Sequence, residues 1–516
     1  MKAETKYKGC IKLAAIGDAL GWITEFEKNT NSLKSKYNTD FISSFHTWEK
    51  SVGGRFNGYT DRLEKGSYSD DTQLLLAVAR SIKEDGSVDK NYFSKIELPS
   101  WLLYSRGAGR TVKNAARKIE RKSVKWNSNF FTYKVGKDTV NYKDSGANGA
   151  AMRILPIALA NFGDIEKTNE EIFANSIVTH GHPRAIIGAM LYGYAIDTIL
   201  KFRPENFSYV AFLTEIGKDI HSKLSIPFIS KPEFQSWVIE WNKGSIKSFR
   251  EQFDSILIEA QNFLRDTYRF ISNKLDDKTA LEHFGCYKNE TKGSGISTVI
   301  AGIYLMCKYF NEPIKAIVQA VNLIGTDTDS IAAFTGGLIG GLHGHSIIPE
   351  RLKTVQDSHY LEEVAIRLLE VSESRAKAKK ATYFPELNSL NNFDSDTFKV
   401  GEEIFFNPLG KGKIQGIERQ KTLTKGKYNL IIDVSFDIGQ NCRFAKFLSD
   451  SNLPQGIDLI TNDIPDDRKS LNTIIPDYDY DTNKRIEKFI GSLDERQVRE
   501  FKQILLQIKK TTRDDD

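Results

Sequence analysis

Apolar residues recur at three- and four-residue intervals along most of the first 385 positions of the chain. This interval places them on one face of a helix, and many of these segments end in glycine, which is a helix-stop signal. Glycine and alanine also recur on the apolar faces, so neighbouring helices can approach one another closely. With 516 residues, of which 40% are hydrophobic, the chain is long enough to bury a large core. We therefore predict a compact all-α domain over residues 1–385.

The composition changes after this helical region. Residues 386–397 lie in a polar stretch rich in asparagine, which is typical of a linker. Residues 398–452 alternate β-branched and polar residues between closely spaced turn signals, and this pattern predicts a small β-barrel. Residues 453–516 contain an amphipathic stretch and are predicted to form a C-terminal helical extension.

Composition also limits the class of protein. Lysine and arginine total 72 against 67 acidic residues, a net charge of +5, which is too small to indicate nucleic-acid binding by the whole chain. The four cysteines are scattered and lack C-x-x-C spacing, which argues against a disulfide framework and a cysteine zinc site. We see neither a signal-peptide core nor an apolar run long enough to span a bilayer. These features predict a soluble cytoplasmic protein with no membrane partner.

Two short acidic motifs carry the strongest chemical signal. The stretch SDDT at 69–72 and the stretch DTDS at 327–330 each precede an apolar helical segment and combine two carboxylates with a hydroxyl. A single helix start needs only one capping side chain, so paired aspartates exceed what capping requires. Four carboxylates brought together would repel one another unless cations lay between them. Oxygen ligands of this kind suit Mg²⁺, Mn²⁺ or Ca²⁺, and two such ions are a common hydrolytic arrangement.

Three further stretches contain candidate site residues. Asp18 and Glu25 lie near the end of the first helical segment, where the alternative for Glu25 is a solvated carboxylate. The small-residue stretch NGAAMR at 148–153 is able to wrap a phosphate or ribose, although a tight turn before a helix has the same pattern. His180 and His182 form an H-x-H pair that suggests zinc, but no suitably spaced third ligand completes such a site.

Taken in order, the motifs GD-x-x-G-x-x-x-E, SDDT, NGAAMR, TH and G-x-DTD-S resemble those of the ADP-ribosylglycohydrolase family, which includes the dinitrogenase-reductase-activating glycohydrolases. The resemblance covers residues 9–380 and implies an all-α domain with two Mg²⁺ ions, or Mn²⁺ in their place, that removes ADP-ribose from a modified target. It implies catalytic roles for Glu25 and Asp71 and substrate contacts for Asn148, Gly149 and His180. The implied metal ligands are Ser69, Asp70, Asp71, Asp327, Asp329 and Ser330.

The resemblance also implies a mechanism and leaves alternatives open. Cleavage at the ribose builds oxocarbenium-like charge, and metals that hold the ribose hydroxyls would fix the ring and polarise the water. Glu25 would orient or deprotonate that water. The alternatives are a non-catalytic ADP-ribose-binding or toxin-neutralising protein on the same fold, and a metal phosphohydrolase of another helical class. The expected substrates are ADP-ribosylated proteins or nucleic acids.

Two features outside these motifs bear on the target. Residues 110–143 are rich in lysine and arginine interleaved with aromatic residues, a pattern that suits nucleic-acid binding but also suits a solvated helix face followed by a loop. The turn and strand pattern within 398–452 resembles the Tudor/SH3-like modules of bacterial repair helicases, which implies contact with protein or nucleic acid. We therefore expect the C-terminal region to select the target, with the linker separating it from the catalytic motifs.

Overall fold

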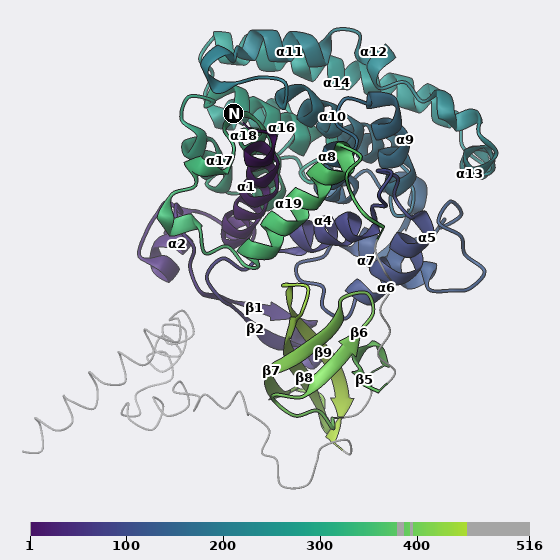
Figure 1. Cartoon of the computed structure of the whole chain (residues 1–516), viewed down its shortest axis with the longest axis vertical. Helices are drawn as coiled ribbons and strands as arrows, with labels where there is room; N and C mark the ends of the chain where they lie inside the picture. Colours follow the sequence, from purple (N-terminus) through teal and green to yellow (C-terminus); the bar gives the residue numbers. More distant parts are fainter. Residues whose placement is uncertain (1, 379–385, 393–395, 451–516) are drawn as a thin grey trace, which may run out of the picture.

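The computed structural model of the chain describes residues 2–378, 386–392 and 396–450 (Figure 1). A body of packed helices occupies the first 378 residues, and a small sheet lies against one end of it. Within the described residues, no helix is both long enough and apolar enough to cross a membrane. The principal helices are α1 (Ala3–Thr24), α2 (Thr30–Tyr37), α4 (Asp70–Ser81), α7 (Arg110–Ile119), α8 (Leu155–Ala160), α9 (Ile165–Ser176), α10 (Pro183–Ile199), α11 (Tyr209–Gly217), α13 (Pro232–Asn242), α14 (Phe249–Ser272), α15 (Asp277–His283), α16 (Gly295–Lys308), α17 (Pro313–Val321), α18 (Thr328–His343) and α19 (Ser358–Ser372).

Helix α18 forms the centre of the helical body, because every residue from 328 to 342 is buried. It packs against α1, α10, α16 and α17, and α1 also packs against α19, which lies beside it in Figure 1. Close approach depends on glycine: a Cβ added to Gly17 would lie 2.2 Å from the carbonyl oxygen of Ala332, and one added to Gly340 would lie 2.1 Å from the carbonyl carbon of Gly9. The prediction that small residues let the helices approach closely is confirmed.

The helical body is not purely α-helical, which corrects the predicted fold class. It carries two antiparallel hairpins, β1 (Trp48–Val52) with β2 (Tyr59–Leu63), and β3 (Thr132–Val135) with β4 (Asp138–Asn141). Both hairpins are inserted between helices, and their strands have four or five residues. Strands this short leave little alternation to distinguish them from loops, so the helical periodicity around them dominated the sequence pattern.

The C-terminal region forms one five-stranded sheet in the order β5–β6–β7–β8–β9. Its strands are β5 (Asn388–Ser389), β6 (Glu403–Phe406), β7 (Gly410–Lys421), β8 (Lys427–Phe436) and β9 (Asn441–Ser449). Strands β6 to β9 pair antiparallel, β5 pairs parallel to β6, and a bulge interrupts β7 between Ile414 and Gly416. The predicted β-structure is therefore present as a sheet with β5 and β9 at its ends. The predicted helical extension at 453–516 lies outside the described residues.

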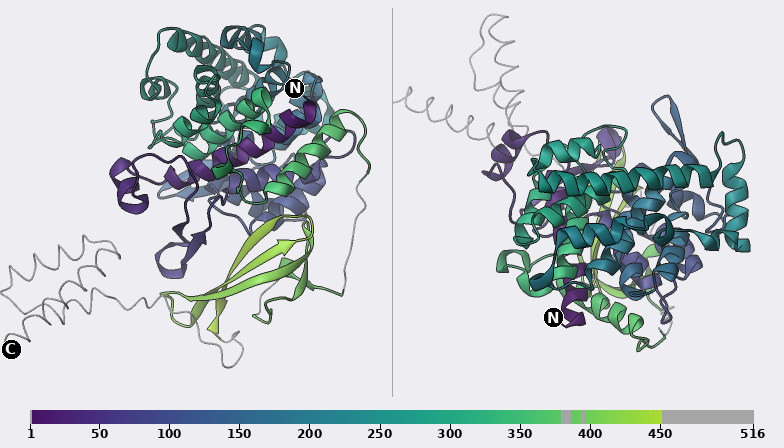
Figure 2. Two further views of the ribbon diagram at one scale, coloured as in Figure 1. Left: turned by 60° about the vertical axis from the view of Figure 1, so that its left-hand side comes forward. Right: turned by 90° about the horizontal axis from the view of Figure 1, so that it is seen from above.

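The sheet lies directly on the helical body, next to hairpin β1–β2 (Figures 1 and 2). The ring of Tyr104 lies 6.0 Å from that of Phe406 and 5.7 Å from that of Phe444, so an aromatic side chain of the helical body packs on the apolar face of the sheet. The backbone N–H of Ala445 donates to the carbonyl of Leu103 at 3.3 Å. This contact differs from the expectation that a linker separates the C-terminal region from the catalytic motifs.

Candidate active site

The start of α4 is held by a residue of α1. The carboxylate of Asp18 accepts the backbone N–H groups of Ser69 and Thr72, each at 3.0 Å, and the hydroxyl of Thr72 at 2.5 Å. The side chain of Ser69 accepts the N–H of Asp71 at 3.2 Å. Capping is therefore performed by Ser69 and by Asp18, which is fully buried. The side chains of Asp70 and Asp71 are therefore not needed to cap α4.

The second acidic motif meets the first at the start of α18. The hydroxyl of Ser330 donates to Oδ2 of Asp71 at 2.6 Å, although 259 positions separate the two residues. Asp329 accepts the backbone N–H of Ser330 at 2.8 Å, and the amide of Asn148 donates to Asp327 at 3.4 Å. The structure therefore brings the motifs at 69–72, 148–153 and 327–330 to one place.

Glu25 joins this group from the end of α1. Its backbone N–H closes the last turn of the helix by donating to the carbonyl of Gly21 at 3.1 Å. A Cβ at Gly21 would lie 2.4 Å from the carbonyl oxygen of Thr328, so only glycine lets the end of α1 lie this close to the start of α18. Glu25 is partly exposed, and burial together with the charge of Asp327 raises its pKa to about 8.

The pKa values of the neighbouring carboxylates are raised as well. Burial, reinforced by the charge of Asp18, raises the pKa of Asp70 to about 7 and that of Asp71 well above its ordinary value. Burial and the charge of Glu25 raise the pKa of Asp329 in the same way. Acidic side chains that raise one another's pKa in this manner form a site of concentrated negative charge.

The donor chemistry of this group fits a hard divalent cation. Within the described part of the chain, no three His, Cys, Asp or Glu side chains converge closely enough to hold an ion by themselves. The group instead combines carboxylates with the hydroxyls of Ser69 and Ser330, both of which are buried. Oxygen donors of these kinds suit Mg²⁺ or Mn²⁺, and a cation would relieve the repulsion that raises the carboxylate pKa values.

The proposed substrate residues lie on the neighbouring 3₁₀ segment Asn148–Arg153 and behind it. A Cβ at Gly149 would lie 2.9 Å from Cε1 of His180, so the imidazole packs directly under this turn. His180 is fully buried, and Thr179 and His180 share a 2.7 Å hydrogen bond. Burial and the charge of Arg153 hold the pKa of His180 well below its ordinary value, so the ring is neutral. The structure places His180 as a support for the turn.

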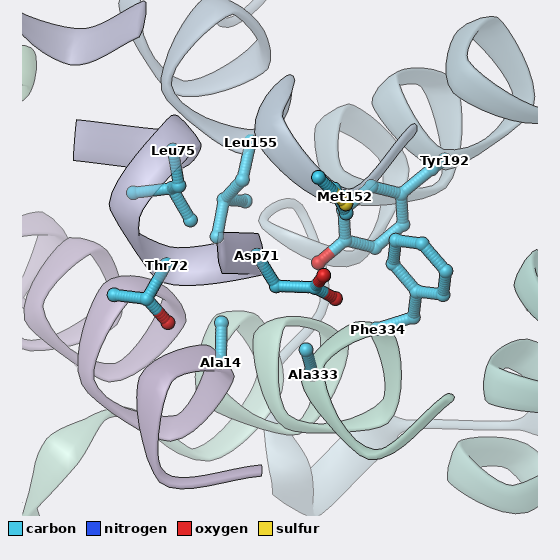
Figure 3. A pocket seen from close by; sticks show the side chains of 9 residues that line it. All are labelled: Ala14, Asp71, Thr72, Leu75, Met152, Leu155, Tyr192, Ala333 and Phe334. Atoms are coloured by element: carbon cyan, nitrogen blue, oxygen red, sulfur yellow. The ribbon is translucent and has the colours of Figure 1, made fainter. Parts of the chain in front are cut away.

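The interior side of Asp71 closes a very small cavity (Figure 3). In this view the carboxylate of Asp71 lies beside the hydroxyl of Tyr192, with Met152 and Phe334 around them. The volume is about 10 Å³, which is room for roughly one water molecule. A cavity of this size is too small to admit an ADP-ribosyl substrate.

The aromatic side chains of the basic segment 110–143 pack partly or fully against the core, whereas most of its other residues are not buried. The rings of Trp126 and Phe234 lie 5.8 Å apart, those of Phe130 and Tyr142 lie 4.6 Å apart, and Phe131 is buried. These rings are therefore engaged in packing and do not form a row of exposed stacking platforms. Asp70 belongs to the cluster of carboxylates described above, called the acidic group from here on (Glu25, Asp70, Asp71, Asp327 and Asp329). Burial lowers the pKa of Lys113 of α7, and the charge of Asp70 opposes that shift.

Sequence comparison identifies the family to which this arrangement belongs. The family profile described as ADP-ribosylglycohydrolase matches residues 1–378. The chain belongs to the ADP-ribosylglycohydrolase family. The predicted membership is confirmed, and the match ends before the C-terminal sheet, so the Tudor/SH3-like assignment stays a prediction.

Three relatives show the range of activities within the ADP-ribosylglycohydrolase family. ADP-ribosyl-[dinitrogen reductase] glycohydrolase of Rhodospirillum rubrum is 25% identical over 65% of this chain and 84% of its own length. ADP-ribosylarginine hydrolase Tri1 of Serratia proteamaculans is 22% identical over 67% of this chain and 73% of its own length. ADP-ribosylhydrolase ARH3 of Mus musculus is 22% identical over 68% of this chain and 86% of its own length. All three names describe hydrolysis of ADP-ribosyl compounds, but they do not share one target.

Two residues near the site were not assigned from the motifs. Asp18 was noticed within its glycine-rich helix but not recognised as the cap of α4, because that contact joins residues 51 positions apart. Lys50 lies in hairpin β1–β2, which the sequence pattern did not predict. Burial lowers its pKa, and the charges of Glu25, Asp329 and Asp70 oppose that shift. The charges of these three carboxylates therefore act on the Lys50 ammonium.

Proposed function

We propose that the protein is a Mg²⁺-dependent hydrolase, with Mn²⁺ as an alternative ion, that removes ADP-ribose from a modified macromolecule. The observation that carries this proposal is the 2.6 Å contact between Ser330 and Asp71, which joins two acidic helix starts into one group. A protein that only bound ADP-ribose would gain nothing from crowding carboxylates whose repulsion opposes folding. Family membership supports the same reaction class.

In this proposal the cations are held by carboxylates and hydroxyls at the two helix starts, namely Ser69, Asp70, Asp71, Asp327, Asp329 and Ser330. When bound, the cations supply Lewis-acid stabilisation for the ribose hydroxyls and the attacking water. Asp18 keeps the start of α4 in position, because it accepts two backbone N–H groups there. The group is thereby assembled before substrate arrives, which reduces the reorganisation needed during the reaction.

Glu25 is proposed to orient the attacking water and accept its proton. The side chain is partly exposed beside Asp327, so water can reach it. Charge develops on the ribose ring during cleavage, and the buried carboxylates nearby stabilise that positive charge. The backbone of Asn148 and Gly149 is proposed to contact the ribose and phosphate, with His180 supporting that turn from behind.

The target is proposed to be an ADP-ribosylated protein. The named activities of the relatives from Rhodospirillum rubrum and Serratia proteamaculans favour this class. A modified nucleic acid is less well supported, because Phe131 of segment 110–143 is buried and Trp126 and Phe130 are partly buried against other rings of the core.

The test is release of ADP-ribose from a panel of modified proteins and nucleic acids, with Mg²⁺ or with EDTA. We expect release from at least one modified protein in Mg²⁺ and none in EDTA. Asp329→Ala should abolish release. Asp254→Ala is the matched control, since Asp254 is an exposed carboxylate of α14 paired with Arg250 at 3.8 Å. Equal turnover with EDTA, or by the Asp329→Ala variant, would contradict the proposal.

A further inference from the structure

Hairpin β1–β2 lies between the acidic group and the C-terminal sheet. On its inner side, the ammonium of Lys50 lies 3.8 Å from the ring centre of Phe26 and 5.0 Å from that of Trp22. Trp22 lies in the last turn of α1 and Phe26 follows the helix, so the two residues flank Glu25 along the chain. Trp48 of the same strand packs edge-on against Trp22 at 5.1 Å. The hairpin therefore packs against the C-terminal end of α1, next to Glu25.

The outer edge of the hairpin is held by side chains of the sheet. The amide of Gln420 on β7 accepts the backbone N–H of Thr60 and donates to its carbonyl, both at 2.9 Å. This amide therefore replaces the neighbouring strand that the open edge of β2 lacks. Asn429 on β8 donates to the carbonyls of Asn57 at 2.9 Å and Gly58 at 3.3 Å. Gln420 and Asn429 are both buried, so these bonds are shielded from water.

A side chain of the sheet also neutralises Asp61, the residue opposite Lys50 in the hairpin. Lys50 pairs with Asp61 across the hairpin, so both side chains leave the same face. Asp61 is buried and accepts a 3.0 Å hydrogen bond from Arg443 of β9, while Arg106 lies 3.4 Å away. Since two arginines neutralise Asp61, its charge does not draw the Lys50 ammonium away from Glu25.

The sheet is also anchored to the helical body by contacts that do not involve the hairpin. Arg80 of α4 donates to Gln440 at 2.5 Å, and Asn441 donates to Asp357 at 2.6 Å. Tyr104 packs on the rings of Phe406 and Phe444, as described above. A sheet fixed at these points is able to hold the hairpin in a constant position relative to α1.

We propose that the C-terminal sheet is a positioning element of the active site, which clamps hairpin β1–β2 and thereby holds Lys50 beside Glu25. Lys50 is a positioning residue, since its charge acts on the reaction through Glu25. The inference rests on the proposed hydrolase function. It assigns the sheet a role in turnover on every substrate, small or macromolecular, in place of target selection alone.

The test uses point variants of the full chain with a small ADP-ribosyl substrate. Lys50→Met should lower kcat about tenfold, which corresponds to loss of about 1.4 kcal/mol of transition-state stabilisation, with little change in KM. Lys50→Arg should recover part of that loss, because the charge is retained. An unchanged kcat with a raised KM for Lys50→Met would overturn the inference, since Lys50 would then bind substrate directly.

A double-mutant cycle tests the clamp itself. Gln420→Ala with Asn429→Ala should lower kcat by a similar factor in the wild-type background and have no further effect when Lys50 is already methionine. Gln415→Ala is the matched control, because the side chain of this exposed glutamine of β7 donates to the carbonyl of Lys413 in its own strand at 3.4 Å and forms no hydrogen bond to the hairpin among the residues that the structure describes. Independent, additive losses would overturn the inference.

Hydrogen exchange distinguishes failure of the clamp from failure of the proposed function. The Gln420→Ala, Asn429→Ala variant should exchange amides faster over residues 48–63 than the wild type, and Gln415→Ala should not. This readout does not need activity. Unchanged exchange over 48–63 overturns the clamp, whereas faster exchange in a protein that releases ADP-ribose from nothing would overturn the hydrolase proposal and leave the clamp in place.

Discussion

Substituting Asp70 by asparagine should stabilise the protein against unfolding at neutral pH in the absence of divalent cations. Burial and the charge of Asp18 raise the pKa of Asp70 from 3.8 to about 7. Between these two values the folded state holds a proton that the unfolded state has lost. Raising the pH through this interval therefore favours unfolding, and the destabilisation is complete above about pH 7.

The magnitude follows from the size of the pKa difference. It amounts to about three pH units, and each is equivalent to about 1.4 kcal/mol, so the upper bound is about 4 kcal/mol. Because neighbouring carboxylates titrate together with Asp70, we expect asparagine to remove on the order of 2–4 kcal/mol of this destabilisation at pH 8. At pH 4, where Asp70 is protonated in the folded state, the benefit should be small.

The assay is urea unfolding followed by tryptophan fluorescence in EDTA, at intervals from pH 4 to pH 8. We expect the free energy of unfolding of the wild type to fall more steeply with pH than that of Asp70→Asn. Asp254→Asn, which alters an exposed carboxylate of α14, should follow the wild type. If wild type and Asp70→Asn lost stability in parallel over this range, the reasoning that Asp70 carries a raised pKa would be refuted.

Three further predictions concern the same site. Glu25→Gln should lower kcat at least tenfold while changing the Kd for ADP-ribose less than threefold, since the amide keeps its size but cannot accept a proton; equal effects on both would move the base elsewhere. Mg²⁺ should bind more tightly at pH 8.5 than at pH 6, because burial and neighbouring charge raise the pKa of Glu25 to about 8 and that of Asp70 to about 7. Calorimetry in two buffers should detect the released protons, and pH-independent affinity would contradict this. Gly17→Ala should lower both Tm and activity, because its Cβ would lie 2.2 Å from a backbone oxygen of α18, whereas Gly109→Ala, with open space around it, should lower neither.

Much of the helical body could be predicted from the sequence because its signals are local. Helical spacing, glycine stops and small residues on apolar faces predicted helices that pack closely, and the pairing of α1 with α18 confirms this. The hairpins were missed because four- or five-residue strands carry too little alternation to be recognised. The C-terminal β-structure was recognised, since β7 and β8 are long enough to show a pattern.

The candidate site also has features that the sequence predicted and features that only the tertiary structure decided. The sequence by itself determined that carboxylates and hydroxyls occur together at two helix starts, because capping and helical spacing depend only on residues a few positions apart. Only the tertiary structure decided that Ser330 bonds to Asp71, that Asp18 caps α4, and that the C-terminal sheet holds the hairpin carrying Lys50. Each of these contacts joins positions from 51 to 360 residues apart. Such contacts are selected by the packing of the whole chain, and no local pattern records them.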